Sequence, residues 1–275
     1  MKVRRSIPLL IAALLACLLA GCSSQWHYDP ITDVNNLEGR RVGVNLAWES
    51  DYYLTGRQDL ELYRYDQTAD MIMALSYDKI DALAIDALGW ANLANLSDGV
   101  ERTEPVGYLN YIMYLGADDK ELGEDINSFL KDFKQTAEYQ DLVDRIDNFD
   151  GVDYVGPDIP LTGTGKVLHV VLDPMNYPRS FPATGTDEAI GYDLEPLKHY
   201  ANDRGYQLDF AYAEYNAALI GLQKGSYDVF VGYLSDVYAE DVISVGLYVT
   251  DPMFSSPLYF VQKTRERISV ETEAL

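Results

Sequence analysis

Three carboxylates stand at or shortly after the ends of β-rich runs of the sequence, at positions where a small molecule could be bound. Glu49 and Asp86 follow such runs in the first half of the chain, and Asp236 follows one in the second half. In an open α/β sheet, ligands bind beyond the carboxyl ends of the strands, where loops and helix N-termini converge. A carboxylate in that place can pair with a cationic solute, or act as a general acid or base if its pKa is shifted.

Other residue types that commonly catalyse reactions or bind metals are not arranged for it. His27, His169 and His199 are far apart in the sequence and lack the spacing of metal ligands. The sequence has no glycine-rich phosphate loop, no serine nucleophile elbow and no nucleophilic thiol. We therefore expect a protein that is not an enzyme and that uses no metal and no cofactor.

The elements that would position these side chains alternate between β-rich runs and amphipathic helical stretches, which indicates an α/β fold. The predicted strands are Arg41–Asn45, Ala82–Ile85, Val167–Leu172, Gln207–Tyr212, Tyr227–Gly232 and Leu258–Gln262. The predicted helices are Thr68–Tyr77, Ala87–Leu96 with Asp86 as its N-cap, Asp119–Asp147 with a break near Thr136, Ala189–Arg204 ended by Gly205, and Asn216–Gln223. Asp150–Lys166 is rich in Gly, Pro and Asp without a periodic pattern, and we interpret it as a linker.

The N-terminal segment has the layout of a secretory signal peptide. Lys2, Arg4 and Arg5 precede an uncharged, mostly apolar run over residues 6–18, followed by Leu-Ala-Gly-Cys22. That run is too short for a membrane-spanning helix, which needs about 20 apolar residues. The four residues that end at Cys22 resemble the lipobox of bacterial lipoproteins, which implies a lipid anchor on Cys22. The protein would then be extracytoplasmic, in the periplasm or on the outer face of the cell membrane. The alternative is an ordinary signal peptide with a chance cysteine.

The chain has a formal net charge of −23, and removal of a signal segment with three basic residues would leave it still more acidic. Proteins that bind nucleic acid need a basic face, so we expect no nucleic-acid partner. An acidic coat also disfavours adhesion to anionic lipid and keeps an exported protein soluble. The two cysteines are Cys17 and Cys22, so the mature chain is expected to rely on its core, not on a disulfide.

Residues 167–263 resemble the first half of family 3 of the periplasmic solute-binding proteins, the amino-acid type. Four pieces follow the order and spacing of that family: LHVVLDPMNYPRSFP, IGYDLEPLKHYANDRGYQLDF, AALIGLQKGSYDVFVGYLS and VTDPMFSSPLYFVQK. Residues 37–150 resemble the second half of the family, through LEGRRVGVN, MIMALSYDKIDALAID and the helical stretch 118–146. The family runs from first half to second half, whereas this chain has the reverse order.

The resemblance implies a two-lobed, periplasmic-binding-protein-like α/β fold of type II in circularly permuted order. The expected parts are a signal peptide at 1–21, a tether at 22–36, lobe 2 at 37–110, lobe 1 at 111–257 with the linker at 150–166, and a hinge strand returning to lobe 2 with a tail at 258–275. Two hinge strands, near Tyr111–Leu115 and Leu258–Gln262, would cross between the lobes. The competing interpretation is two half-domains left from a tandem array, although neither half could close a cleft by itself.

The resemblance also implies roles for single residues. It places Tyr177 and Phe181 in an aromatic turn that stacks on the solute, and Tyr215 in an aromatic wall. The turn residues could instead pack as core aromatics of lobe 1. Asp86 stands where amino-acid binders hold an ammonium group, although this carboxylate could also serve as a helix cap alone.

The sequence departs from the family where amino-acid binders recognise a carboxylate. Ala239 or Glu240 stands where the family has a clamping Arg, which would bind a carboxylate through two hydrogen bonds. Residues 47–49, Ala-Trp-Glu, replace the usual Gly-Thr anion turn. Arg179 in the aromatic turn could substitute for the clamp, unless it is a surface residue.

The remaining candidate lining is acidic and aromatic, which suits a cationic or amine-bearing solute held by ion pairing and cation–π contact. The expected ligand residues are Trp48, Glu49, Asp86, Tyr177, Arg179, Phe181, Tyr215, Tyr233, Ser235 and Asp236. We expect a monomeric, lipid-anchored protein that delivers a small polar solute, such as an amino acid or amine, to an ABC transporter permease. Two alternatives are a lyase or dehydratase on the same fold, with Glu49, Asp86 and Asp236 as candidate acids or bases, and a sensory or protein-binding module that has lost transport function.

Overall fold

The computed structural model describes residues 29–96, 99–173, 176–183, 185, 188–232 and 234–264. The expected signal segment, Cys22 and Tyr233 lie outside these ranges. Residues 31–275 form one compact unit, which is distinct from residues 1–30. Within the described ranges, no helix is both long and apolar enough to cross a membrane.

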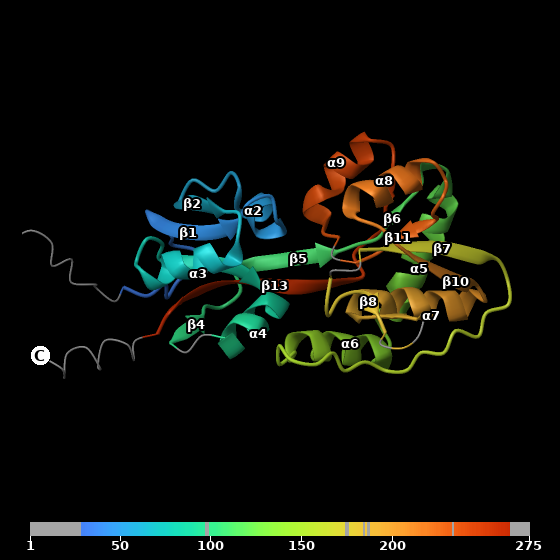
Figure 1. Cartoon of the computed structure of the whole chain (residues 1–275), viewed down its shortest axis with the longest axis horizontal. Helices are drawn as coiled ribbons and strands as arrows, with labels where there is room; N and C mark the ends of the chain where they lie inside the picture. The colour runs from blue at the N-terminus through green and yellow to red at the C-terminus, as the bar shows by residue number, and fades with distance from the viewer. Residues whose placement is uncertain are drawn as a thin grey trace, which may run out of the picture. The chain divides into compact units, whose positions relative to one another are not determined.

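The first of two open sheets has the strand order β2–β1–β3–β13–β4, and β5 also pairs with β13 (Figure 1). Its strands are β1 (Arg40–Asn45), β2 (Leu60–Tyr65), β3 (Ala82–Asp86), β4 (Val100–Arg102), β5 (Gly107–Tyr111) and β13 (Phe254–Lys263). β1 runs parallel to β2 and β3, whereas β13 runs antiparallel to β3, β4 and β5. We call this sheet and its helices lobe 2.

Each parallel strand of lobe 2 is followed by a helix. The helices are α2 (Glu49–Leu54), α3 (Thr68–Ser76) and α4 (Ala87–Leu96). α3 buries Met71 and Leu75 in a cluster with Leu83 of β3 and Val261 of β13. Full burial of such a side chain contributes about 1.5–3 kcal/mol, so this packing fixes α3 on the sheet. The parallel direction of β1, β2 and β3 brings their carboxyl ends to one edge of the sheet.

The second sheet has the strand order β10–β7–β11–β6–β12, and we call it and its helices lobe 1. Its strands are β6 (Tyr114–Leu115), β7 (Val167–Leu172), β10 (Gln207–Tyr212), β11 (Val229–Phe230) and β12 (Tyr248–Val249). Its helices are α5 (Lys120–Phe133), α6 (Ala137–Asp147), α7 (Glu195–Arg204), α8 (Tyr215–Gln223) and α9 (Ala239–Ser244). The smaller elements are the 3-10 turns η1 (Ala117–Asp119), η2 (Tyr192–Leu194) and η3 (Asp236–Tyr238), and the ladder of β8 (Phe181–Pro182) with β9 (Ala189–Ile190).

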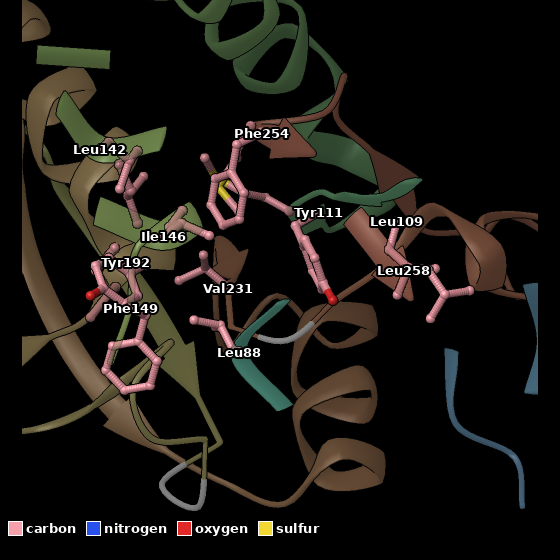
Figure 2. Close-up of a cluster of buried hydrophobic side chains, with 14 of the residues drawn as sticks. Leu88, Leu109, Tyr111, Leu142, Ile146, Phe149, Tyr192, Val231, Phe254 and Leu258 are labelled. Carbon is pink, nitrogen blue, oxygen red and sulfur yellow. The ribbon is translucent and has the colours of Figure 1, made fainter. Parts of the chain in front are cut away.

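Two chain segments pass side by side between the sheets. β5 leads into β6 of the second sheet, and β12 leads into β13 of the first. β5 and β13 lie side by side and are antiparallel (Figure 1). Phe254 lies opposite Tyr111, and Leu258 lies opposite Gly107. The ring centroids of Tyr111 and Phe254 are 5.5 Å apart, and Figure 2 shows both in one buried cluster with Leu109 and Leu258. The crossing strands therefore share the apolar core of the molecule.

The two-lobed α/β fold expected from the sequence is confirmed by these two sheets. β7, β10 and α4 have the predicted bounds, because each is an apolar run between clear turn or cap residues. The long helical region breaks at Thr136, as predicted. The Thr136 hydroxyl accepts a hydrogen bond of 3.2 Å from the Tyr139 N–H and thereby caps α6.

Some predicted bounds are wrong. The helix expected from Ala189 begins at Glu195, after β9 and η2, and Pro196 stands in its first turn, where proline is tolerated. It ends at Gly205, as predicted, because glycine readily adopts the left-handed conformation (φ 72°) that closes the helix. β11 is shorter than predicted, whereas β13 is longer because its first half pairs with β5. β2 was not predicted.

The predicted linker, Asp150–Lys166, contains no helix or strand, but its second half is bound to lobe 1. Asn202 of α7 accepts a hydrogen bond from the Thr162 N–H and donates one to the Pro160 carbonyl, both at 3.0 Å. The Gly165 N–H donates to the carbonyl of Gly205 at 2.8 Å. These contacts pair the backbone of the linker with the end of α7.

The segment before β1 lies beside the last strand of lobe 2. The Ile31 N–H donates to Gln262 Oε1 at 2.7 Å, and Gln262 Nε2 donates to the Ile31 carbonyl at 3.3 Å. Both residues are buried. The polypeptide therefore enters and leaves the described fold at neighbouring points of one sheet.

Candidate functional site

A cavity of about 920 Å³ is lined by residues of both lobes. Its described lining comes from the ends of β1 and β3, the helices that follow the strands of lobe 2, the turn after β7, and α8 and α9 of lobe 1. The lining includes six of the ten predicted ligand residues: Trp48, Glu49, Asp86, Tyr177, Arg179 and Tyr215. The volume lies within the usual range for small-molecule sites, about 300–1,000 Å³. The position at strand ends is also where open α/β sheets bind ligands.

Three predicted ligand residues are not among the described lining residues. Phe181 packs on Tyr177 instead, with ring centroids 4.8 Å apart. Ser235 is fully buried, and its hydroxyl accepts a hydrogen bond from a backbone N–H of η3. Asp236 accepts a hydrogen bond of 2.8 Å from the side-chain amide of Asn110 on β5. Their contacts therefore lie within the protein, around the crossing strands and the aromatic turn.

The turn between β1 and α2 is held by a buried carboxylate. Asp51 accepts a hydrogen bond of 3.0 Å from the Ala47 N–H and pairs with Arg64 of β2 at 2.9 Å. Ala47 has a φ of 60°, a left-handed conformation that residues with a side chain rarely adopt. The bond to Asp51 supports this conformation and places Trp48 and Glu49 against the cavity. Glu49 is only 3% exposed.

Arg179 is buried in a cluster with two carboxylates. It is 2% exposed, so the surface position that the sequence left open is wrong. Its guanidinium lies 2.8 Å from Asp86 Oδ2 and 3.3 Å from Asp193 Oδ1, and 3.5 Å from the ring centroid of Tyr111. Asp86 Oδ1 accepts a hydrogen bond of 2.8 Å from the Gly89 N–H, which confirms the predicted cap of α4. Asp86 thus binds the helix start and Arg179 at the same time.

The cluster around Arg179 joins the two lobes. Asp86 ends β3 of lobe 2, whereas Arg179 and Asp193 belong to lobe 1. The Asp193 N–H donates to the Arg179 carbonyl at 2.9 Å. This close approach requires glycine at position 191, because a Cβ on Gly191 (φ 135°) would lie 2.2 Å from that carbonyl oxygen. This backbone hydrogen bond therefore holds Arg179 and Asp193 close together, in addition to the contact between their side chains.

Tyr177 connects the cavity with the linker. It lines the cavity, while its hydroxyl donates to the Val152 carbonyl at 2.8 Å and accepts from the Tyr154 N–H at 2.6 Å. The Tyr154 hydroxyl donates in turn to Glu195, which pairs with Arg145 of α6 at 2.6 Å. Burial raises the pKa of Tyr154, and the charge of Glu195 raises it further. The position of Tyr177 therefore depends on the first half of the linker.

Tyrosines from both lobes gather near Glu49. The rings of Tyr52 and Tyr238 meet edge to face with centroids 4.8 Å apart, and the Tyr238 hydroxyl donates to the Ala47 carbonyl at 3.2 Å. Burial raises the pKa of Tyr215 and of Tyr238, and the charge of Glu49 contributes to both increases. Glu49 therefore shares the cavity with tyrosines of both lobes.

Several lining residues were not predicted from the sequence. Tyr52 follows Glu49 by three positions, the spacing that places two side chains on one helix face, so a signal for it was present. Tyr238 lies in η3, and no pattern marked it. Leu219 and Val242 have the spacing of ordinary core residues on α8 and α9. Among the described side chains, no group of three or more His, Cys, Asp or Glu is arranged to hold a metal ion.

Comparison with known sequences returned no family. No protein-family model matches the chain, and no curated protein matches its sequence. Any function proposed for this chain therefore rests on its own sequence, on its fold and on the lining of the cavity.

Solved structures of similar fold include proteins of different function. One is the ligand-binding component of an ABC-type import system from Staphylococcus aureus with zinc bound, at 8% identity and a TM-score of 0.40, covering 86% of this chain and 70% of the other. A second is the probable amino-acid ABC transporter extracellular-binding protein ytmK from Bacillus subtilis, at 8% and 0.41, covering 84% and 87%. A third is the probable transcriptional regulator PA0477 from Pseudomonas aeruginosa, at 12% and 0.38, covering 97% and 74%. All identities are below 25% and all TM-scores below 0.5, so no function is drawn from them.

The cluster around Arg179 predicts an order of stability among three variants. Arg179→Ala leaves Asp86 and Asp193 buried without their counter-charge and should lower the free energy of unfolding by about 3–5 kcal/mol. Asp86→Asn leaves Arg179 paired with Asp193 and should cost less, about 1–3 kcal/mol. Arg57→Ala removes the partly exposed pair with Asp59 and serves as the control, with a loss below about 1 kcal/mol. Urea denaturation measures all three, and equal losses for Arg179→Ala and Arg57→Ala would contradict the role of the cluster.

Proposed function

We propose that this chain is a solute-binding protein, which holds a small polar molecule between its lobes and delivers it to an ABC transporter permease. The observation that carries the proposal is the cavity of about 920 Å³, which both lobes line. Only short connections follow β5 and precede β13 where the chain crosses between the sheets. A pair of crossing strands is a common hinge for closure of two lobes around a ligand. The cavity and the crossing strands together therefore support the proposal of solute binding.

We propose further that the solute is bound without covalent chemistry. Of the three carboxylates that could act as acid or base, Asp86 is bound to Arg179 and the start of α4. Asp236 is bonded to Asn110 and is not among the described lining residues. Glu49 is buried and lines the cavity, and catalysis by acid and base commonly needs two groups of different pKa. This arrangement favours a binding site over a lyase.

The proposal includes export and a lipid anchor, which rest on the first 22 residues of the sequence. A basic start, a short apolar run and Leu-Ala-Gly before Cys22 fit a lipoprotein signal. An acyl chain on Cys22 would hold the protein at the membrane, where a permease would receive the solute. We propose that the protein acts as a monomer.

We also propose that the order of the halves is a circular permutation of the family that the sequence resembles. The chain starts in lobe 2, crosses to lobe 1 between β5 and β6, and returns between β12 and β13. The linker 150–166 joins α6 to β7, both of lobe 1. It stands where the resembled family would have its two ends. Close chain ends make such a rearrangement tolerable.

Solute binding predicts a ligand-dependent rise in melting temperature. A thermal-shift screen of the mature protein against amino acids, amines, betaines and short peptides should give a hit, because a ligand at 100 times its Kd stabilises the native state by about 2.7 kcal/mol. Leu219→Trp, which fills the cavity from α8, should weaken the hit at least about tenfold by calorimetry, or about 1.4 kcal/mol. Ile220→Trp, at an exposed position outside the lining, is the matched control. Recovery of chemically altered solute would indicate a lyase instead, and a screen without hits would contradict the proposal.

The lipid anchor predicts opposite results for the two cysteines. Expressed with its signal segment in a bacterium, the protein should partition into the detergent phase of a Triton X-114 extract. Cys22→Ser should move it to the aqueous phase or leave an uncleaved precursor, because the lipid has no attachment site. Cys17→Ser lies within the apolar run and should leave the partition unchanged. Retention of the Cys22→Ser variant in the detergent phase as a processed protein would refute the anchor.

Circular permutation predicts that the family order also folds. A variant joined from residue 264 to residue 31 by a short Gly-Ser segment, with new ends between Gly156 and Pro157, should unfold cooperatively in urea close to the parent midpoint. The join is short because Ile31 and Gln262 are hydrogen-bonded. A second variant opened within β7, between Val170 and Val171, should not fold, because this strand lies between β10 and β11. Failure of both variants would contradict the permutation.

A further inference from the structure

The described lining of the cavity contains more acidic than basic side chains. Its described lining contains the carboxylates of Glu49, Asp86 and Asp241 and one cation, Arg179. Arg179 lies within 3.3 Å of two carboxylates, Asp86 and Asp193, and stacks on Tyr111. Its charge is thus already offset by the protein. The one cation among these lining residues is therefore already paired, so an anionic group of a solute would have no free positive partner there.

The backbone N–H groups of the turn after the first strand of lobe 2 are engaged within the protein. Anion sites at strand ends commonly use successive N–H groups of the turn. Here the Leu46 N–H donates to the Tyr65 carbonyl, the Ala47 N–H to Asp51 and the Trp48 N–H to the Asn45 carbonyl, at 2.9, 3.0 and 3.2 Å. At the end of β3, the Gly89 N–H donates to Asp86. These four N–H groups are therefore occupied by the protein itself.

Glu49 stands in a different environment from Asp86. It is 3% exposed, lines the cavity, and belongs to the first turn of α2. Tyr52 and Trp48 flank it in lobe 2, and Tyr215 and Tyr238 line the same cavity from lobe 1. Burial raises the pKa of Tyr215 and Tyr238, and the charge of Glu49 contributes to both increases. Closely placed aromatic rings around a buried carboxylate form a site for a cation.

The rest of the described lining is mostly apolar. Aliphatic side chains come from both lobes and include Ile72, Leu88, Leu219, Val242 and Val245. Such a surface favours the body of a solute with apolar groups, because contact with it removes apolar area from water. The volume of about 920 Å³ leaves room for a body larger than a free amino acid.

We propose that the solute is an organic cation with an apolar body, whose ammonium group binds between Glu49 and the rings of Tyr52, Tyr215 and Tyr238. This inference rests on the proposed solute-binding function and specifies the chemical class of its ligand. The cation replaces its water shell with one carboxylate and several ring faces from two lobes. Because Glu49 and Tyr52 belong to lobe 2, whereas Tyr215 and Tyr238 belong to lobe 1, the bound ammonium stabilises the closed arrangement.

The test compares aromatic amines with analogues in which the ammonium group is neutralised, joined by a carboxylate or replaced by one. Calorimetry with the mature protein uses phenethylamine and tryptamine, their N-acetyl amides, the amino acids phenylalanine and tryptophan, and the acids 3-phenylpropionate and indole-3-propionate. At least one amine should bind. Its amide, amino acid and acid should bind at least about tenfold more weakly, equivalent to 1.4 kcal/mol or more, because each loses the cation or adds an unpaired carboxylate.

Two pairs of variants test the proposed residues with the amine that binds. Glu49→Gln should weaken it about thirtyfold or more, whereas Glu240→Gln, an exposed neighbour on α9 outside the described lining, should leave it unchanged. Tyr215→Phe keeps the ring and should stay within about threefold, whereas Tyr215→Leu should lose about fivefold or more. Melting temperatures of the free variants show whether each remains folded; a folded Glu49→Gln variant that binds like the parent overturns the assignment of Glu49.

The outcomes separate this inference from the proposed function. Equal or tighter binding of an amide, amino acid or acid overturns the cation class while leaving solute binding intact. The same holds if neither amine binds but the broad screen finds a neutral or anionic solute. If no solute of any class binds, both the function and the inference fail.

Discussion

The pairing of one arginine with two buried carboxylates is the constraint on which the rest of the site depends. Arg179 contacts Asp86 at the end of β3 and Asp193 in η2, and its guanidinium lies on the ring of Tyr111 at the end of β5. Two charges of one sign and one of the other are costly to bury, and the cost is offset only while all partners are present. The cluster thereby holds a turn of lobe 1 against a strand end of lobe 2, beside the end of β5.

This pairing also decides which groups remain for a solute. The family that the sequence resembles uses an arginine for the solute's carboxylate, and this chain has Ala239 or Glu240 in that place. Arg179 does not restore the function, because its positive charge serves the protein's own carboxylates. In the same way, the N–H groups of the β1–α2 turn donate hydrogen bonds to Asp51 and to neighbouring carbonyls. The absence of an arginine at that place and the closure of the turn both support the proposed class of solute, one without an essential anionic group.

Local patterns of the sequence predicted the framework well, and long-range pairing explains what they missed. β7 and β10 are continuous apolar or alternating runs between turns, so their bounds followed from neighbouring residues alone. The burial of Arg179 could not be seen in this way, because its partner Asp86 is 93 positions away in the chain. β2 was missed because LELYRY is half-exposed and carries charges, and its pairing with β1 decides its conformation. Six of the predicted ligand residues line the cavity, because neighbouring residues in the sequence indicate where each strand ends. Whether Phe181 lines the cavity or packs on Tyr177 depends instead on tertiary contacts.

The hydroxyl of Tyr177 links the wall of the cavity to residues 152–154, so binding of a solute in the cavity can be measured at those residues. One oxygen atom is bonded to the carbonyl of Val152 and to the amide of Tyr154, while the same side chain forms part of the cavity wall. A solute that shifts this ring must strain or release both bonds, and by thermodynamic reciprocity the loosening of residues 152–154 must alter the affinity of the solute. The exchange rate of the Tyr154 amide proton with solvent should therefore change when such a solute occupies the cavity, although Tyr154 belongs to the linker.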